Sequence, residues 1–188
     1  WLINGARLPS GRLLVLAATV DSRFAALRQL GTDAVLLKPS AAIAPDAWAY
    51  ETARLPGTSP RISLNTAVLL HTDGYVYLVG GRAQSDYGPV GAQILARAPV
   101  ARVDIEGGAG FRELQYWAGA QAGWQPKASV AAELFAGRFT EGSLVRMGGD
   151  FFFVGLQAFD RSVSIFFASS LPGPGADARV LYAPPPVA

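Results

Sequence analysis

The chain has 188 residues, of which 51% are hydrophobic and only 16% are charged. This balance provides enough apolar side chains for a packed core and excludes a largely disordered chain. The formal net charge is only +2 and the basic residues form no run, which argues against nucleic-acid binding. There is no cysteine, which excludes disulfides, thiol nucleophiles and cysteine-based zinc sites. No apolar run approaches the roughly 18 residues of a membrane-spanning helix.

Three segments of the chain share one pattern, at residues 4–16, 65–78 and 141–154. Each begins with a polar residue and continues with a short apolar run, a turn containing glycine and a second apolar run. The turns carry residues that tolerate positive φ, and the flanking runs are rich in branched or aromatic side chains. The pattern therefore predicts three β-hairpins.

Two further apolar segments, which we expect to be strands, follow each predicted hairpin. They are residues 33–38 and 47–52, then 92–98 and 112–118, and finally 163–168 and 178–182. Four antiparallel strands recurring in one order are typical of a β-propeller. We therefore predict an all-β fold of three four-stranded antiparallel blades in a single domain, residues 1–188, with blades at about 3–56, 62–119 and 139–184. A β-sandwich of about twelve strands is the alternative.

Three blades do not close a ring, because propellers contain about four to eight blades. The predicted blades would then belong to a larger propeller, and their two flanks would carry unpaired edges and apolar faces. The missing blades could come from a second chain, from a second copy of this chain or from a further segment of a longer protein. We favour the first and the last of these sources.

The first strand of each predicted blade opens with Asn4, Asn65 or Glu141. In a propeller this strand lines the central channel, so we expect the three side chains to lie near one another around the axis. Two amides and a carboxylate together donate and accept the hydrogen bonds that a polyhydroxylated ligand needs. The alternative for both asparagines is turn or strand-entry hydrogen bonding, and for Glu141 it is a hydrogen bond to the backbone.

Glu141 is the residue that we expect to perform chemistry. Glycoside hydrolysis uses one carboxylic acid to protonate the leaving oxygen and a second carboxylate as base or nucleophile. A partly dry channel would keep such an acid protonated near neutral pH. Asp160 is the candidate second carboxylate, although an ion pair with Arg161 or a turn cap is its alternative role. Gln157 and Arg161 are candidate substrate-binding residues, and Trp117 is a candidate for stacking on a sugar.

Two other features suggest no chemistry. His71 is the single histidine and lies beside a predicted turn. Without a second histidine or a cysteine, the sequence predicts no transition-metal site, and we expect no cofactor. The glycine-rich residues 107–110 precede no helix pattern, so we predict a flexible loop there and not a phosphate cradle.

The third repeat resembles a known family. Glu141-Gly142-Ser143, a strand at 149–153 and the segment 164–174 follow one another as in the general-acid blade of five-bladed propeller glycosidases of the arabinanase and β-xylosidase type. Ser143 stands where that family has proline. The resemblance implies a five-bladed propeller in which Glu141 is the general acid. The nucleophile or base aspartate that the family carries on an early blade has no clear match in this sequence.

The second repeat resembles a related propeller family, a domain of unknown function with members linked to arabinan breakdown. The segments that carry this resemblance are 73–77, 95–99 and 114–117. Residues 79–82 also resemble a kelch repeat, but the other two repeats lack the glycine pair.

The sequence thus predicts a carbohydrate-active hydrolase, similar to glycosidases, that acts on a pentose or furanose polymer such as arabinan at the propeller axis. The alternative is a non-catalytic propeller that binds glycan or scaffolds a partner, because a second catalytic carboxylate is not evident. We expect a carbohydrate ligand, no nucleic acid and no membrane span. We also expect a bacterial protein that is secreted or located in the cell envelope.

Overall fold

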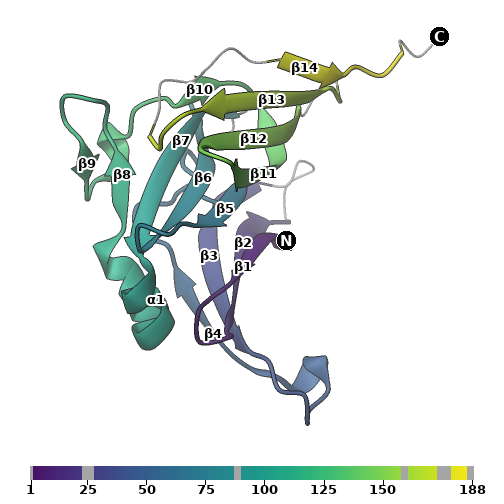
Figure 1. Ribbon diagram of the computed structural model, residues 1–188, viewed down its shortest axis with the longest axis vertical. Helices are drawn as coiled ribbons and strands as arrows, with labels where there is room; N and C mark the ends of the chain where they lie inside the picture. The colour runs from purple at the N-terminus through teal and green to yellow at the C-terminus, as the bar shows by residue number, and fades with distance from the viewer. Residues whose placement is uncertain (1, 23–27, 87–89, 158–160, 173–178, 186–188) are drawn as a thin grey trace.

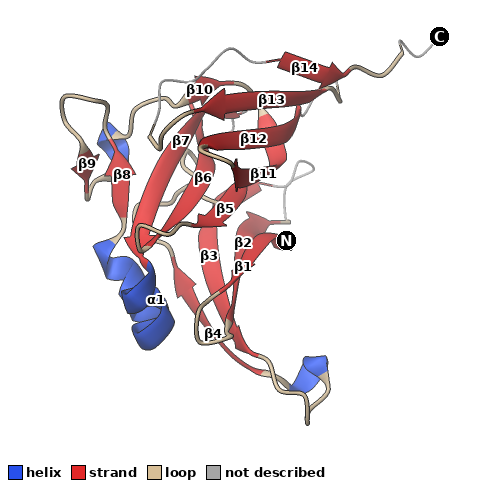
Figure 2. Cartoon of the chain, viewed as in Figure 1, coloured by secondary structure: helices blue, strands red, loops and turns tan. Residues whose placement is uncertain are grey.

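The computed structural model describes residues 2–22, 28–86, 90–157, 161–172 and 179–185. Three antiparallel β-sheets follow one another along the chain, and one short α-helix packs beside them within these residues (Figures 1 and 2). The expectation of an all-β fold built from repeated antiparallel sheets is therefore confirmed.

The first and third sheets each have four strands in chain order, as predicted. The first contains β1 (Leu2–Arg7), β2 (Leu13–Asp21), β3 (Arg28–Lys38) and β4 (Ala49–Arg54), with a 3-10 helix, η1 (Pro45–Ala47), before β4. The third contains β11 (Phe139–Met147), β12 (Asp150–Gln157), β13 (Val163–Ala168) and β14 (Arg179–Tyr182).

The middle sheet has six strands, so the prediction of four is wrong here. Its strands are β5 (Ala67–Leu70), β6 (Tyr75–Ala83), β7 (Val90–Pro99), β8 (Gln115–Trp117), β9 (Trp124–Gln125) and β10 (Phe135–Ala136). The reason is the length of β7, which is 10 residues, whereas β8 has only 3. β8 pairs with Ala96 and Arg97 near one end of β7, and β10 pairs with Ala92 and Gln93 near the other.

Helical structure occupies a region where we expected a loop and the start of a strand. The helix α1 (Val100–Glu106) continues into the 3-10 helix η2 (Gly107–Glu113), and a further 3-10 helix, η3 (Ala128–Val130), follows β9. The flexible loop predicted at 107–110 is therefore wrong. Buried side chains of Val103 and Phe111 anchor this segment in the core, and that tertiary contact is absent from the local sequence pattern.

The middle sheet is covered on both faces. Along β6, Val76 and Leu78 belong to a core shared with the first sheet, whereas Tyr77 and Val79 belong to a core shared with the third. Alternate residues of a strand point to opposite faces, and here both faces are covered, so all four side chains are buried. The middle sheet is therefore the layer that joins the other two.

The described residues leave the outer face of the third sheet uncovered. Cross-strand pairs align Val145 with Phe152 and Phe152 with Phe167 on this face. The large apolar side chains of this sheet that are exposed are Val145, Met147, Leu156, Phe167, Val180, Leu181 and Tyr182. An apolar sheet face of this kind is typical of a surface that packs against another element.

Two phenylalanines test which face of the third sheet is buried. Phe153 is 3% exposed and lies in the core shared with the middle sheet, whereas Phe167 is 45% exposed on the outer face. We expect Phe153→Ala to lower the free energy of unfolding by about 3–5 kcal/mol because it creates a core cavity. Phe167→Ala, the matched control, should lower the free energy of unfolding by less than about 1 kcal/mol. Urea unfolding measures both values, and equal losses would contradict the assignment of faces.

Candidate functional site

The first strands of the three sheets meet at one place. β5 contacts both β1 and β11, and Figure 1 shows the three strands close together near the middle of the view. The side-chain nitrogen of Asn4 donates to the carbonyl of Thr66 at 3.3 Å and to the carbonyl of Gly142 at 2.7 Å. The backbone N–H of Gly142 also donates to the Thr66 carbonyl, at 3.0 Å. We call Asn4, Thr66 and Gly142 the axial junction.

The axial junction lies next to the two other predicted strand-opening residues. Asn65 precedes Thr66 and Glu141 precedes Gly142, so the backbone at all three strand openings is brought together. The Asn4 amide itself is engaged by the backbone, because its oxygen also accepts from the N–H of Gly5 at 3.0 Å. Its geometry therefore matches the strand-entry alternative.

Asn65 and Glu141 differ from Asn4. Asn65 is only 5% exposed, yet its side-chain amide makes no hydrogen bond with any other described residue. The exposed part of the residue includes the amide atoms, which are not fully buried and can therefore bind water or a ligand. Glu141 is exposed and has neither an ion pair nor a side-chain hydrogen bond with the part of the chain that is described. The residues that adjoin the junction in the sequence therefore include an unbonded amide and an unbonded carboxylate.

A local irregularity places Glu141 and Asn4 in comparable positions. The register of β1 against β2 shifts between Leu2 and Asn4, and that of β11 against β12 shifts between Phe139 and Glu141. Such bulges re-aim the following side chain. No register shift of this kind accompanies Asn65, which lies before the first residue of β5, Ala67. The internal equivalence predicted for the three residues therefore holds best for the first and third sheets.

The end of β12 lies at the same end of the third sheet as Glu141. Gln157 pairs with Phe139, and its side-chain oxygen accepts from the N–H of Arg138 at 3.4 Å. Arg161 is exposed and has φ 56°, a backbone conformation that residues other than glycine seldom adopt. Asp160 lies outside the described residues. The roles predicted for these three residues stay predictions.

Trp117 is far from the axial junction. It lies on β8, three strand positions from β5, which corresponds to about 14 Å. Its ring packs against Trp124 with centroids 5.5 Å apart, and Arg97 lies over Trp124 at 4.2 Å. These contacts serve the core between the middle and third sheets, so nothing in the geometry brings Trp117 to the strand openings.

Two titratable groups beside that core are perturbed. Burial raises the pKa of Tyr77 to about 12, and the hydrogen bond that its hydroxyl donates to Asp73 at 2.6 Å adds to the rise. For Asp73, burial acts to raise the pKa, but hydrogen bonds from Tyr77, His71 and the Tyr75 N–H outweigh it and hold the pKa below its usual value. Both groups lie by the hairpin turn of the middle sheet, at the opposite end of β5 from Asn65.

Sequence reasoning missed a group of charged residues at the strand-opening end. Asp21 ends β2 and is 8% exposed, and it pairs in register with Arg28 at the start of β3. Asp86 follows β6 and forms ion pairs with Arg28 at 3.6 Å and Arg61 at 2.6 Å. An acidic residue that ends an apolar strand could have drawn attention to Asp21. The ion pairs of Asp86 with Arg28 and Arg61 join residues far apart in the sequence, so the sequence could not show them.

Neither a metal site nor a membrane span emerges from the described ranges. No group of three or more histidine, aspartate or glutamate residues there is arranged to hold an ion. No helix in the same ranges combines the length and the apolar character required to cross a membrane.

Comparison with known proteins supports the fold. No family model and no curated protein matches the sequence. The crystal structure of a putative hydrolase from Bacteroides ovatus matches 98% of this chain with a TM-score of 0.69 and 18% identity. This chain covers 45% of that protein, so it spans less than half of its length. This likeness shows that the two proteins share an arrangement of sheets. At 18% identity it shows nothing about a shared function.

Two crystal structures of the GH43_1 enzyme from Xanthomonas citri are more distant. One has a TM-score of 0.42 at 11% identity and covers 96% of this chain and 73% of the enzyme. The other, complexed with xylose, has a TM-score of 0.41 at 10% identity and covers 97% and 73%. Scores this low add nothing to the fold assignment.

Replacing Asn4 tests the axial junction. Asn4→Ala removes the donor to two carbonyls and should lower the free energy of unfolding by about 1–3 kcal/mol. Asn4→Asp should cost at least as much, because a carboxylate would face two carbonyl oxygens without donating a proton. Gln121→Ala removes an exposed amide and is the control. Urea unfolding of the three variants measures the effect, and an Asn4→Asp variant as stable as the parent would contradict the junction.

The raised pKa of Tyr77 predicts a loss of stability in alkali. An unfolded phenol ionises near pH 10, whereas the folded one ionises at about 12. The contribution of Tyr77 is therefore complete below about pH 10 and is lost as the pH rises from about 10 to 12. We expect the urea midpoint of the parent to fall between pH 9.5 and about 11, and to fall less in Tyr77→Phe. Tyr50→Phe, at a residue that is 70% exposed, should behave like the parent.

Proposed function

We propose that this chain is part of a carbohydrate-active hydrolase with a β-propeller fold, whose site lies where β1, β5 and β11 begin. The observation that carries the proposal is that two unbonded polar residues adjoin the junction: Asn65, whose amide has no hydrogen-bond partner among the described residues, and the exposed Glu141. An amide that donates and accepts suits sugar hydroxyls, and a carboxylic acid suits glycosidic oxygen. The likeness to a putative hydrolase agrees with this class.

Three sheets of this kind would be consecutive blades, and further sheets would complete the ring. Two observations support this part of the proposal. The outer face of the third sheet carries exposed apolar side chains, including Phe167 at 45% and Met147 at 64%. The likeness to the Bacteroides ovatus protein extends over 98% of this chain but 45% of that protein. We infer that the occupant of the outer face is another antiparallel sheet, supplied by a second chain or by a further segment of a longer protein.

In the proposed reaction Glu141 is the general acid. It would deliver a proton to the glycosidic oxygen as the bond to the anomeric carbon breaks, while a second carboxylate acts as base or nucleophile. Asp160 is the partner suggested by the sequence. The substrate class that we propose is a pentose or furanose polymer such as arabinan.

A propeller that binds glycan without cleaving it is the second candidate. The observation that favours it is the engagement of Asn4 by the Thr66 and Gly142 carbonyls, which leaves fewer polar groups for substrate than the sequence suggested. In addition, no described carboxylate forms an interaction with Glu141.

Replacing Glu141 separates the two functions. Glu141→Gln keeps the shape and hydrogen-bonding reach of the side chain but removes the transferable proton. We expect it to lower kcat on arabinan oligosaccharides by at least about 100-fold with little change in KM, which is the scale of general acid catalysis. Reducing-sugar release from the complete protein is the measurement.

The matched control is Glu133→Gln, at an exposed glutamate in the segment before β10. Its turnover should equal that of the parent. If Glu141→Gln also hydrolyses at the parental rate, the acid role is wrong. If the parent binds arabinan oligosaccharides but releases no sugar, the non-catalytic candidate is correct.

A further inference from the structure

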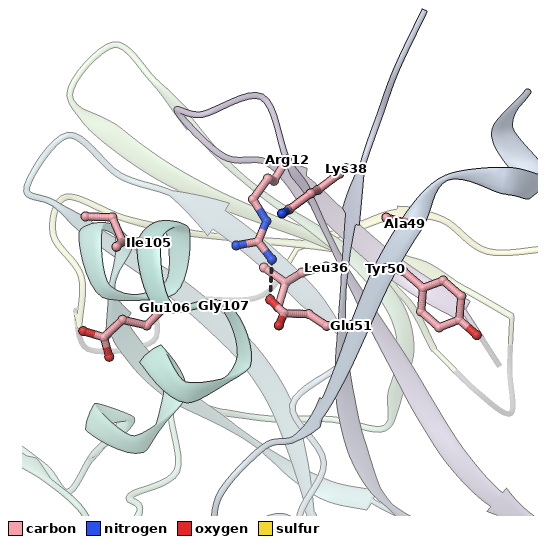
Figure 3. A pocket seen from close by; sticks show the side chains of 9 residues that line it. All are labelled: Arg12, Leu36, Lys38, Ala49, Tyr50, Glu51, Ile105, Glu106 and Gly107. Atoms are coloured by element: carbon pink, nitrogen blue, oxygen red, sulfur yellow. Dashed lines mark hydrogen bonds and ion pairs between the residues drawn. The ribbon is translucent and has the colours of Figure 1, made fainter. Parts of the chain in front are cut away.

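A cavity of about 250 Å³ lies between the first sheet and the helix α1. It is far from the axial junction, because its residues come from the hairpin end of the first sheet. Figure 3 shows Arg12 and Lys38 on one side of it and Ile105 and Glu106 on the other. An adjoining cavity of about 530 Å³ shares Arg12, Lys38 and Ile105 and extends toward Arg7.

Arg12 is held rigidly in this space. Its guanidinium forms an ion pair with Glu51 and donates to the carbonyl of Asp104 at 3.2 Å. The side chain is only 13% exposed, and its Nε is buried without a hydrogen-bond partner among the described residues. Gly107 lets the helix pass close to Glu51, since a Cβ at this position, where φ is 61°, would collide with that carboxylate. Arg12 is therefore a cation held by partners on both β4 and α1.

The other cations of the two cavities have no partner among the described residues. Lys38 and Arg7 line the larger cavity and form no ion pair or side-chain hydrogen bond within the described part of the chain. Glu51 and Glu106, which line the smaller cavity, pair with Arg12 and Arg102, and the larger cavity has three cations but one carboxylate, Asp104. That carboxylate accepts from both the N–H and the hydroxyl of Ser10. In Figure 3 the ammonium of Lys38 and the guanidinium of Arg12 point into the same space.

Cations that share one space repel each other unless an anion lies between them. We propose that this cavity binds an anionic group, a carboxylate or a phosphate, carried on a molecule of the size of one sugar. Arg12 and Lys38 bind the anion by charge-assisted hydrogen bonds, Arg7 adds attraction from the rim, and the exposed Ile105 contacts the apolar side of the ring. This site is distinct from the proposed hydrolytic site, which lies at the other end of the first sheet.

Three probes of one ring size isolate the contribution of charge. Glucuronate carries a carboxylate, glucose 6-phosphate carries a phosphate, and glucose is neutral. Titration calorimetry of the complete protein should show that at least one anion binds about 10-fold more tightly than glucose, because one charge-assisted hydrogen bond provides that ratio. The tighter of the two anions identifies the group. Glucose binding as tightly as both anions would overturn the proposal.

Lys38 has a matched control, because Lys127 is the other lysine of the chain. Lys38→Gln should weaken binding of the preferred anion about 10-fold, whereas Lys127→Gln should leave it unchanged. Unchanged affinity in Lys38→Gln would overturn the site.

Acylation of the unmodified protein provides an independent readout, because it needs no variant to fold. Acetylation of Lys38, measured by peptide mass spectrometry relative to Lys127, should slow when the preferred anion is present. Equal rates with and without the anion would also overturn the site. Glu141→Gln should retain anion binding, so a failure of the hydrolase proposal and a failure of this one give different results.

Discussion

The carbonyl of Thr66 is the group on which the arrangement of the three sheets depends. It accepts one hydrogen bond from the Asn4 side chain, in the first sheet, and one from the Gly142 N–H, in the third. Each sheet pairs its strands internally, so this contact is what aligns their first strands. Because Asn65 and Glu141 adjoin the bonded residues, the same contact that fixes the sheets also brings the backbone at these two positions together.

Burial of the middle sheet on both faces explains why its long strands are so rich in apolar residues. β6 reads as a nearly continuous apolar run because Val76 and Leu78 serve one core and Tyr77 and Val79 the other. Close packing also reaches the backbone, since a Cβ at Gly80 would collide with the carbonyl of Ser63. The third sheet contributes only one face to these cores, which leaves its outer apolar face available for the further sheet that we propose.

The hairpins were predictable because period-two alternation and glycine-containing turns are local signals. The extra strands and helices of the middle sheet were not. α1 lacks a side-chain hydrogen bond at its N-terminus, and it is anchored by Val100 and Val103 through contacts with residues distant in the sequence. At the candidate site, the sequence identified the strand openings. It could not reveal that the Asn4 amide binds backbone or that the Asn65 amide has no hydrogen-bond partner among the described residues, because both depend on how the sheets meet.

Catalysis and completion of the ring are linked through the face on which Glu141 lies. From Glu141 onward β11 pairs regularly with β12, so Glu141 shares the outer face with Val145 and with its partner Leu156. Both apolar neighbours are exposed, at 39% and 37%. A sheet that packed on this face to bury them would also remove water from Glu141, and removal of water is what keeps a carboxylic acid protonated near neutral pH. The proposed acid would therefore become competent only when the proposed ring is complete.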